Sequence, residues 1–164
     1  MKALRIGLAI AIAYFSLRLI AFGLNMQHQL FAKSPFIPYL ILMWAGMIYA
    51  ILQYRKQFPT APWMDSFKEG GRVVLVASVL TALSIFIYYK FIDTEFLDML
   101  SVDVYNHAKT QISGEDLEKY YEMTKFYNSP KVRSMFFLSG TTIGGLVSAV
   151  LVAYFAKLFL DRKQ

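Results

Sequence analysis

Residues 134–156 read SMFFLSGTTIGGLVSAVLVAYFA, an uninterrupted run without a charged side chain between Arg133 and Lys157. A helix rises about 1.5 Å per residue, so this run is long enough to cross the roughly 30 Å hydrocarbon core of a bilayer. Residues 34–54 and residues 73–89 are also free of charge. These three segments predict membrane-spanning helices.

The first apolar segment of the chain is interrupted by a charge. Residues 6–17 are uncharged, Arg18 follows them, and apolar residues then resume. A cleaved signal peptide would also have basic residues, a short apolar core and a small-residue cleavage site, here residues 21–23. Because Arg18 lies between that core and that site, the sequence favours a retained fourth span over residues 3–24.

The overall composition is that of a membrane protein. Hydrophobic residues make up 57% of the chain and charged residues 17%, whereas soluble domains have about 45–50% and about 25%. The chain has no cysteine, which excludes disulfides and cysteine metal sites. Its two histidines, His28 and His107, fall in separate segments between the expected spans. We therefore expect no cofactor and no metal.

The charges of the chain predict its orientation. With four spans, both termini and the loop 55–72 share one side, which carries nine cations against three anions. The other side carries seven cations against eight anions. By the positive-inside rule, we expect both termini in the cytoplasm and residues 91–130 outside it. The pI near 9.5 then reflects topology and anionic lipid headgroups, so no nucleic-acid partner is expected.

Residues 91–130 form the longest expected extramembrane segment. Apolar residues recur at helical spacing in residues 94–110, and a second helical pattern covers residues 115–127. We expect a helical hairpin at the outer membrane–water boundary. The predicted fold is an all-α integral membrane protein with four transmembrane helices and this extracytoplasmic amphipathic helical segment between helices 3 and 4. The expected transmembrane helices are residues 3–24, 35–54, 71–90 and 132–157.

Arg18 is the one charged residue well inside a predicted span. Ionisable residues within the membrane commonly mark functional sites, so Arg18 is a candidate contact for an anion or a lipid phosphate. The alternative is that its side chain snorkels to the outer interface, about one and a half turns away. The sequence favours snorkelling.

The sequence offers few candidates for catalytic or metal chemistry. Asp93, Glu95 and Asp98 are weak candidates for holding a divalent cation. Acidic residues also favour the first turn of a helix because of its macrodipole, and this explanation is preferred. Since no nucleophile–base pair and no known catalytic motif is visible, no catalytic residue is assigned.

Aromatic residues occur beside the predicted spans. Trp63 and Phe67 precede the third span, and Tyr120, Tyr121 and Tyr127 follow it in the extramembrane segment. Aromatic side chains often lie at the level of the lipid headgroups, so we expect these five residues at the interfaces. A sugar-binding role for the tyrosines is the less favoured alternative.

Small residues recur every fourth position within residues 134–156. Such faces let two helices approach closely. A phosphate-binding loop is disfavoured there, because exposed loop backbone is costly in hydrocarbon. The contact is either with another helix of the same chain, which is preferred, or with a partner subunit. The residues are Gly140, Gly144 and Ser148 on one face and Gly145, Ala149 and Ala153 beside it.

Three local features, taken in order, resemble a known family. They are WMDSFKEGG at 63–71, FIDTEFLDML at 91–100, and a glycine-containing last helix that ends in LDRKQ at 160–164. Together they resemble the bacterial four-helix membrane family described as domain of unknown function 4199, over residues 5–164. The resemblance implies the architecture and a location in the bacterial inner membrane. It implies no activity and no catalytic residue.

The sequence predicts a non-enzymatic inner-membrane accessory or assembly subunit of a cell-envelope complex. A membrane glycosyltransferase or an export machine is the kind of partner expected, by analogy with other small four-helix subunits. The alternative is a small transporter or lipid-handling protein, homo-oligomeric, that uses Arg18 on an anionic substrate. In either case we expect contact with the lipid bilayer and either a membrane-protein partner or self-association.

Overall fold

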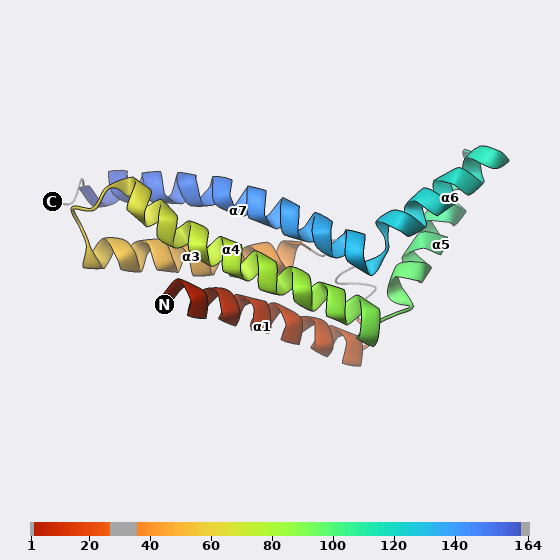
Figure 1. The fold of residues 1–164 in the computed structure, drawn as a ribbon, viewed down its shortest axis with the longest axis horizontal. Helices are drawn as coiled ribbons and strands as arrows, with labels where there is room; N and C mark the ends of the chain where they lie inside the picture. Colours follow the sequence, from red (N-terminus) through yellow and green to blue (C-terminus); the bar gives the residue numbers. More distant parts are fainter. Residues whose placement is uncertain (1, 27–35, 162–164) are drawn as a thin grey trace.

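The structure is a computed structural model that describes residues 2–26 and 36–161. Four of its helices are long and apolar enough to cross a membrane, so the chain is a multi-pass, all-α membrane protein, as predicted (Figure 1). The third of these spans is α4 continued by the π-helix η1. The elements are α1 (Lys2–Gly23), α3 (Ile37–Gln57), α4 (Trp63–Ile87), η1 (Tyr88–Ile92), α5 (Phe96–Ala108), α6 (Glu115–Tyr127) and α7 (Pro130–Asp161).

The third long helix begins earlier than the sequence analysis places it, at Trp63 rather than at residue 71. Pro62 directly precedes its first residue and ends the turn, since proline is compatible with a helix start but not with a helix interior. The charged residues that follow stay helical and pair along the helix surface. These pairs are Lys68 with Asp65 and Arg72 with Glu69.

α4 is the central helix of the bundle. It packs against α1, α3 and α7, and half of the residues in its most apolar window are buried, compared with 22% in α7. Close approach to α1 depends on Gly7, where an added Cβ would lie only 2.7 Å from Cγ1 of Val76. The core therefore lies along α4, whereas α7 exposes much of its length to the surroundings.

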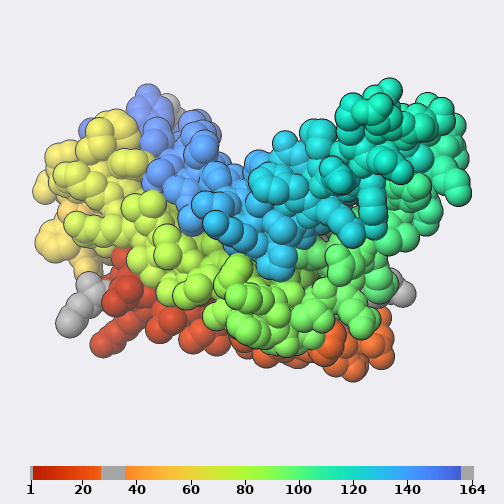
Figure 2. Space-filling model, turned by 45° about the vertical axis from the view of Figure 1, so that its right-hand side comes forward, coloured from red at the N-terminus to blue at the C-terminus, as the bar shows by residue number. Residues whose placement is uncertain are grey.

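The predicted helical segment between the third and fourth spans is confirmed as two helices, α5 and α6. They pack against each other as a hairpin, with the rings of Tyr105 and Tyr121 4.9 Å apart. Gly114, directly before the first residue of α6, has a φ of 69°, a conformation that favours glycine. The hairpin forms a separate lobe at one end of the bundle, here called the hairpin end (Figure 2). The start of α1, the end of α7 and the α3–α4 turn lie toward the opposite end (Figure 1).

Candidate functional site

Arg18 faces the inside of the bundle and not the membrane surface. Its exposed fraction is 2%, so the expectation that its side chain snorkels to the interface is wrong. The inward position is possible because Tyr14, four residues earlier, lies on the same face of α1. Arg18 Nε donates a hydrogen bond to the Tyr14 hydroxyl at 3.1 Å. The bundle thus holds a buried cation near one of its ends.

Three tyrosine rings surround the Arg18 guanidinium. Its central carbon lies 5.3 Å from the centre of the Tyr14 ring, and Tyr88 and Tyr89 lie at 5.2 Å and 5.0 Å. Cations within about 6 Å of an aromatic ring are attracted to its face, more strongly where water is excluded. These contacts stabilise a charge that would be costly in an apolar core.

The π-helix η1 positions the two tyrosines that end the third span. The Asp93 amide donates to the Tyr88 carbonyl at 2.9 Å, the five-residue spacing of a π-helix. The Tyr88 hydroxyl donates to Asp93 Oδ2 at 3.0 Å. The Tyr89 hydroxyl is buried, and no described residue makes a hydrogen bond of standard geometry to it. Local π-helices often occur at functional sites. Here, η1 carries two of the tyrosines that surround Arg18.

A second arginine approaches the same region from α7. Arg133 Nη1 donates to Asn128 Oδ1 at 3.1 Å, and Asn128 Nδ2 donates to Ser101 Oγ at 3.0 Å. The Ser101 hydroxyl in turn donates to the Leu97 carbonyl at 2.8 Å. This chain of hydrogen bonds joins the start of α7 to the hairpin, and it fixes the position of the Arg133 side chain.

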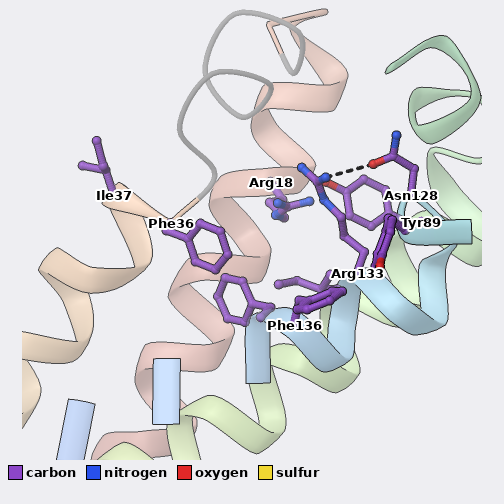
Figure 3. A pocket seen from close by; sticks show the side chains of 10 residues that line it. Arg18, Phe36, Ile37, Tyr89, Asn128, Arg133 and Phe136 are labelled. Carbon is purple, nitrogen blue, oxygen red and sulfur yellow. Dashed lines mark hydrogen bonds between the residues drawn. The ribbon is translucent and has the colours of Figure 1, made fainter. Parts of the chain in front are cut away.

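Arg18 and Arg133 line one pocket of about 550 Å³ at the hairpin end. Figure 3 shows Arg18 between Phe36 on one side and the hydrogen-bonded pair Arg133 and Asn128 on the other. Two guanidinium groups from different helices, with amide and phenol groups nearby, are suited to hold an anion. The described lining residues are Arg18, Phe36, Ile37, Ile85, Tyr89, Tyr127, Asn128, Arg133, Phe136 and Phe137.

An aromatic cluster lies directly beside the pocket. The Phe137 ring is stacked on Phe36 at 5.1 Å and contacts Tyr39 edge-on at 4.9 Å. The Tyr14 ring, which also faces Arg18, packs against both Tyr39 and Phe137. Aromatic pairs in these geometries add stability beyond the area they bury. The pocket therefore borders a closely packed aromatic part of the core.

The three acidic candidates do not come together. Asp93 is buried and accepts a hydrogen bond from Tyr88, whereas Glu95 and Asp98 are exposed. Among residues 2–26 and 36–161, no cluster of three carboxylate or histidine side chains could hold a metal ion. Asp98 lies in the first turn of α5, where the helix dipole favours an acid. Asp93 instead accepts the hydrogen bond of the Tyr88 hydroxyl.

The two small-residue faces of α7 have different surroundings. Gly145 packs inside the bundle: an added Cβ would lie 2.5 Å from Cγ1 of Val74, and Ala149 and Ala153 on the same face are fully buried. Gly140 and Gly144 are exposed, and an added Cβ at either would meet no described residue within 4 Å. The Ser148 hydroxyl donates to the Gly144 carbonyl at 2.8 Å.

The predicted interfacial aromatics lie at both ends of the molecule. Trp63 and Phe67 are partly buried against the core near the α3–α4 turn. Tyr120 is exposed on the hairpin, and Tyr121 is half-buried against Tyr105. Tyr127 lines the pocket. Their expected position at the lipid headgroups stays a prediction.

Several residues of the site were not identified from the sequence. In the sequence, Arg133 stands out only as the charge before the last uncharged run. The spacing of Tyr14 and Arg18 was a usable signal, since residues four apart share a helix face. The other residues carried no local signal, because only the tertiary fold brings them to Arg18. The residues missed are Tyr14, Tyr88, Tyr89, Asn128 and Arg133.

Comparison with known proteins agrees with the architecture. The family model described as "Protein of unknown function (DUF4199)" matches residues 4–157, which include almost all of the four long helices and the whole hairpin. No curated protein and no solved structure matches the chain significantly. The chain belongs to the DUF4199 family.

Proposed function

We propose that the chain is a non-enzymatic, lipid-handling protein of the bacterial inner membrane that binds an anionic ligand between Arg18 and Arg133. The observation that carries this proposal is the convergence of two arginines from different helices on one pocket. A buried arginine within a membrane span is costly, so such residues usually have a function. Here the cation–π contacts and hydrogen bonds hold both groups in position before a ligand arrives.

The chemical groups of the pocket favour binding over catalysis. Its described polar residues are two arginines, two tyrosines and Asn128, and the other described lining residues are apolar. Arginine stays protonated at any physiological pH, so it serves as a fixed positive charge and a poor proton carrier. Rigid donors of this kind suit recognition and retention of an anion.

The proposed orientation follows the distribution of charge. The end of the bundle that holds the start of α1, the end of α7 and the α3–α4 turn carries more cations than anions, and the positive-inside rule favours it in the cytoplasm. The pocket would then lie near the outer leaflet, together with the hairpin. Reporter fusions test this orientation: a fusion at residue 110 should report from outside the cytoplasm and one at residue 164 from inside. The reverse pattern would overturn it.

A second candidate function is that of an accessory or assembly subunit of a cell-envelope complex. It is favoured by the exposed face of α7, where Gly140 and Gly144 leave space that another transmembrane helix could fill. The partner would be a membrane protein, such as a glycosyltransferase or an export component, or a second copy of this chain. This role and ligand binding are compatible, because they use different surfaces.

One purification experiment tests the proposed function. The protein is extracted from a bacterial membrane in a mild non-ionic detergent and examined by native mass spectrometry. The wild type is compared with Arg18→Gln and Arg133→Gln, and the matched control is Arg72→Gln, whose arginine is exposed on α4 and paired with Glu69.

The wild type and the control should retain an anionic small molecule that both pocket variants lose. Equal retention by all four proteins, or no small molecule in any of them, would overturn the ligand-binding function. A protein partner retained by all four would support the accessory role.

A further inference from the structure

We propose that the ligand is a lipid with a phosphate headgroup. The phosphate would lie between Arg18 and Arg133, and the acyl chain would leave through an apolar mouth formed by Phe36, Ile37 and Phe136. This inference rests on the proposed anion-binding function and names the chemical class of the ligand.

The charged part of the pocket lies at its buried end. Arg18 and Tyr89 are each 2% exposed, and Asn128, also in the lining, is buried. The Tyr89 hydroxyl has no hydrogen-bond partner of standard geometry among the described residues, so it can donate to a ligand oxygen. The buried end of the pocket therefore offers the charge of Arg18 and hydrogen-bond donors from Tyr89 and Asn128, and the half-buried Arg133 adds a second charge beside it.

The outer part of the same pocket is apolar and exposed. The exposed fractions of Phe36, Ile37 and Phe136 are 40%, 55% and 56%. Figure 3 shows Phe36 and Phe136 beside Arg18, with Ile37 further out on α3. A site for a soluble anion would gain nothing from an exposed apolar mouth. For a lipid, such a mouth provides contact for the first methylene groups of the chain while the headgroup reaches the arginines.

The depth of Arg18 also fits a lipid headgroup. Arg18 lies five residues before the end of α1, which corresponds to about 7 Å along the helix axis. With α1 spanning the bilayer, Arg18 would lie close to the level at which hydrocarbon gives way to headgroups. A lipid needs only a small displacement to bring its headgroup into the pocket, whereas a soluble anion must pass the apolar mouth.

The two arginines favour phosphate over a carboxylate as the bound group. A guanidinium forms paired hydrogen bonds to two oxygens of one group, and a phosphate has enough oxygens to engage two guanidiniums from different directions. A carboxylate has only two oxygens and a single charge. The pocket volume of about 550 Å³ is in the usual range for small ligands. It accommodates a headgroup, with most of the chain left in the bilayer.

Three probes separate the headgroup from the chain. The purified protein, in a non-ionic detergent, is titrated with dioleoyl phosphatidic acid, with glycerol 3-phosphate and with dioleoylglycerol. Binding is followed by native mass spectrometry and by the rise in Tm that a ligand of the folded state produces. Phosphatidic acid has both parts, glycerol 3-phosphate has only the phosphate, and dioleoylglycerol has only the chains.

Variants at the mouth separate a specific contact from simple enrichment in the micelle. Ile37→Ser changes an exposed residue of the mouth. Ile41→Ser is the matched control, one turn further along α3, exposed to a similar extent and outside the pocket lining. Arg18→Gln and Arg133→Gln, with Arg72→Gln as their control, test the headgroup contact.

We expect phosphatidic acid to bind roughly tenfold or more tightly than glycerol 3-phosphate, because chain and headgroup contacts act together. Dioleoylglycerol should give no specific signal. Ile37→Ser should weaken phosphatidic acid severalfold and leave glycerol 3-phosphate unchanged, whereas Ile41→Ser should change neither. The two pocket arginine variants should abolish specific binding.

The possible failures are distinguishable. If glycerol 3-phosphate binds as tightly as phosphatidic acid, or if Ile37→Ser has no effect on either probe, the lipid inference is overturned and the anion-binding function stands. If dioleoylglycerol binds as well as phosphatidic acid, or if no probe binds, the anion-binding function fails as well.

Discussion

The guanidinium of Arg18, on α1, lies 5.0 Å from the centre of the Tyr89 ring, at the end of the third span. Both residues belong to candidate membrane-spanning helices, where a buried charge is costly. The contact with the ring stabilises the cation inside the bundle. Arg133 lines the same pocket from α7, and Asn128 connects it to the hairpin. The hairpin end of the molecule therefore combines positive charge, aromatic rings and an apolar opening, which is the basis of the functional proposal.

Removing the hydroxyl of Tyr14 should cost more stability than removing that of Tyr89. Tyr14 accepts a hydrogen bond from Arg18, and hydrogen bonds to charged groups contribute about 1.5–3 kcal/mol. Tyr89 has no such bond of standard geometry among the described residues, and phenylalanine keeps the ring. In thermal unfolding, Tyr14→Phe should lower Tm by several degrees and Tyr89→Phe should leave it nearly unchanged. Equal losses would contradict the described arrangement.

Asn128 should control how firmly the hairpin is attached to the bundle. Its side chain is buried and bonds both Arg133 and Ser101. Asn128→Ala removes these bonds, at a cost of about 1–3 kcal/mol for the partners left unsatisfied. Amide hydrogen exchange in α5 and α6 should become about tenfold faster or more. Asn106→Ala, at an exposed position of α5, is the control, and similar exchange in both variants would count against this coupling.

The two glycine faces of α7 should respond differently to a large side chain. Gly145→Leu would overlap Val74 and Met43, and overpacking of this kind typically costs about 1–3 kcal/mol or more. It should reduce the yield of folded monomer and its Tm. Gly144→Leu meets no described residue and should leave both unchanged.

The same pair of variants tests the accessory role. If the exposed face of α7 binds a partner helix, Gly144→Leu should remove a co-purifying membrane protein or a dimer while the monomer stays stable. A Gly144→Leu variant that keeps all of its associations would argue against an interface at this face.

Of the three acidic candidates, only Asp93 should contribute to the stability of the fold. Removal of metal by a chelator should not change that stability. Asp93→Ala leaves the buried Tyr88 hydroxyl without its acceptor, which costs about 1–3 kcal/mol. Glu95→Ala and Asp98→Ala change exposed residues and should stay within about 0.5 kcal/mol. Addition of a metal chelator should leave Tm unchanged. A large fall in Tm on chelation would instead indicate a metal site at these residues.

The architecture of this chain is largely predictable from its sequence, because bilayer thickness imposes long charge-free segments. Residues 134–156 and the two similar runs identify three spans directly. Helical spacing in residues 94–110 predicts the first hairpin helix. The start of the third helix was missed because its first turns carry charged residues, which pair along the helix surface outside the hydrophobic stretch.

The candidate site is much less predictable. Whether Arg18 points inward or toward the interface depends on what packs against α1, and the sequence of α1 does not encode its neighbours. Tyr89 and Arg133 are 71 and 115 positions away from Arg18 along the chain. Both flank apolar runs, where aromatic and basic residues are common for other reasons. Their meeting at one pocket is a property of the tertiary fold.

The most direct test of the proposed ligand is the position of a phosphate in an experimental structure. The protein would be crystallised in a lipidic phase that contains phosphatidic acid. We expect phosphate density within about 3.5 Å of both guanidiniums, Arg18 and Arg133, with an acyl chain passing Ile37 and Phe136. Phosphate density confined to other surfaces, with hydrocarbon or nothing between the two arginines, would contradict it.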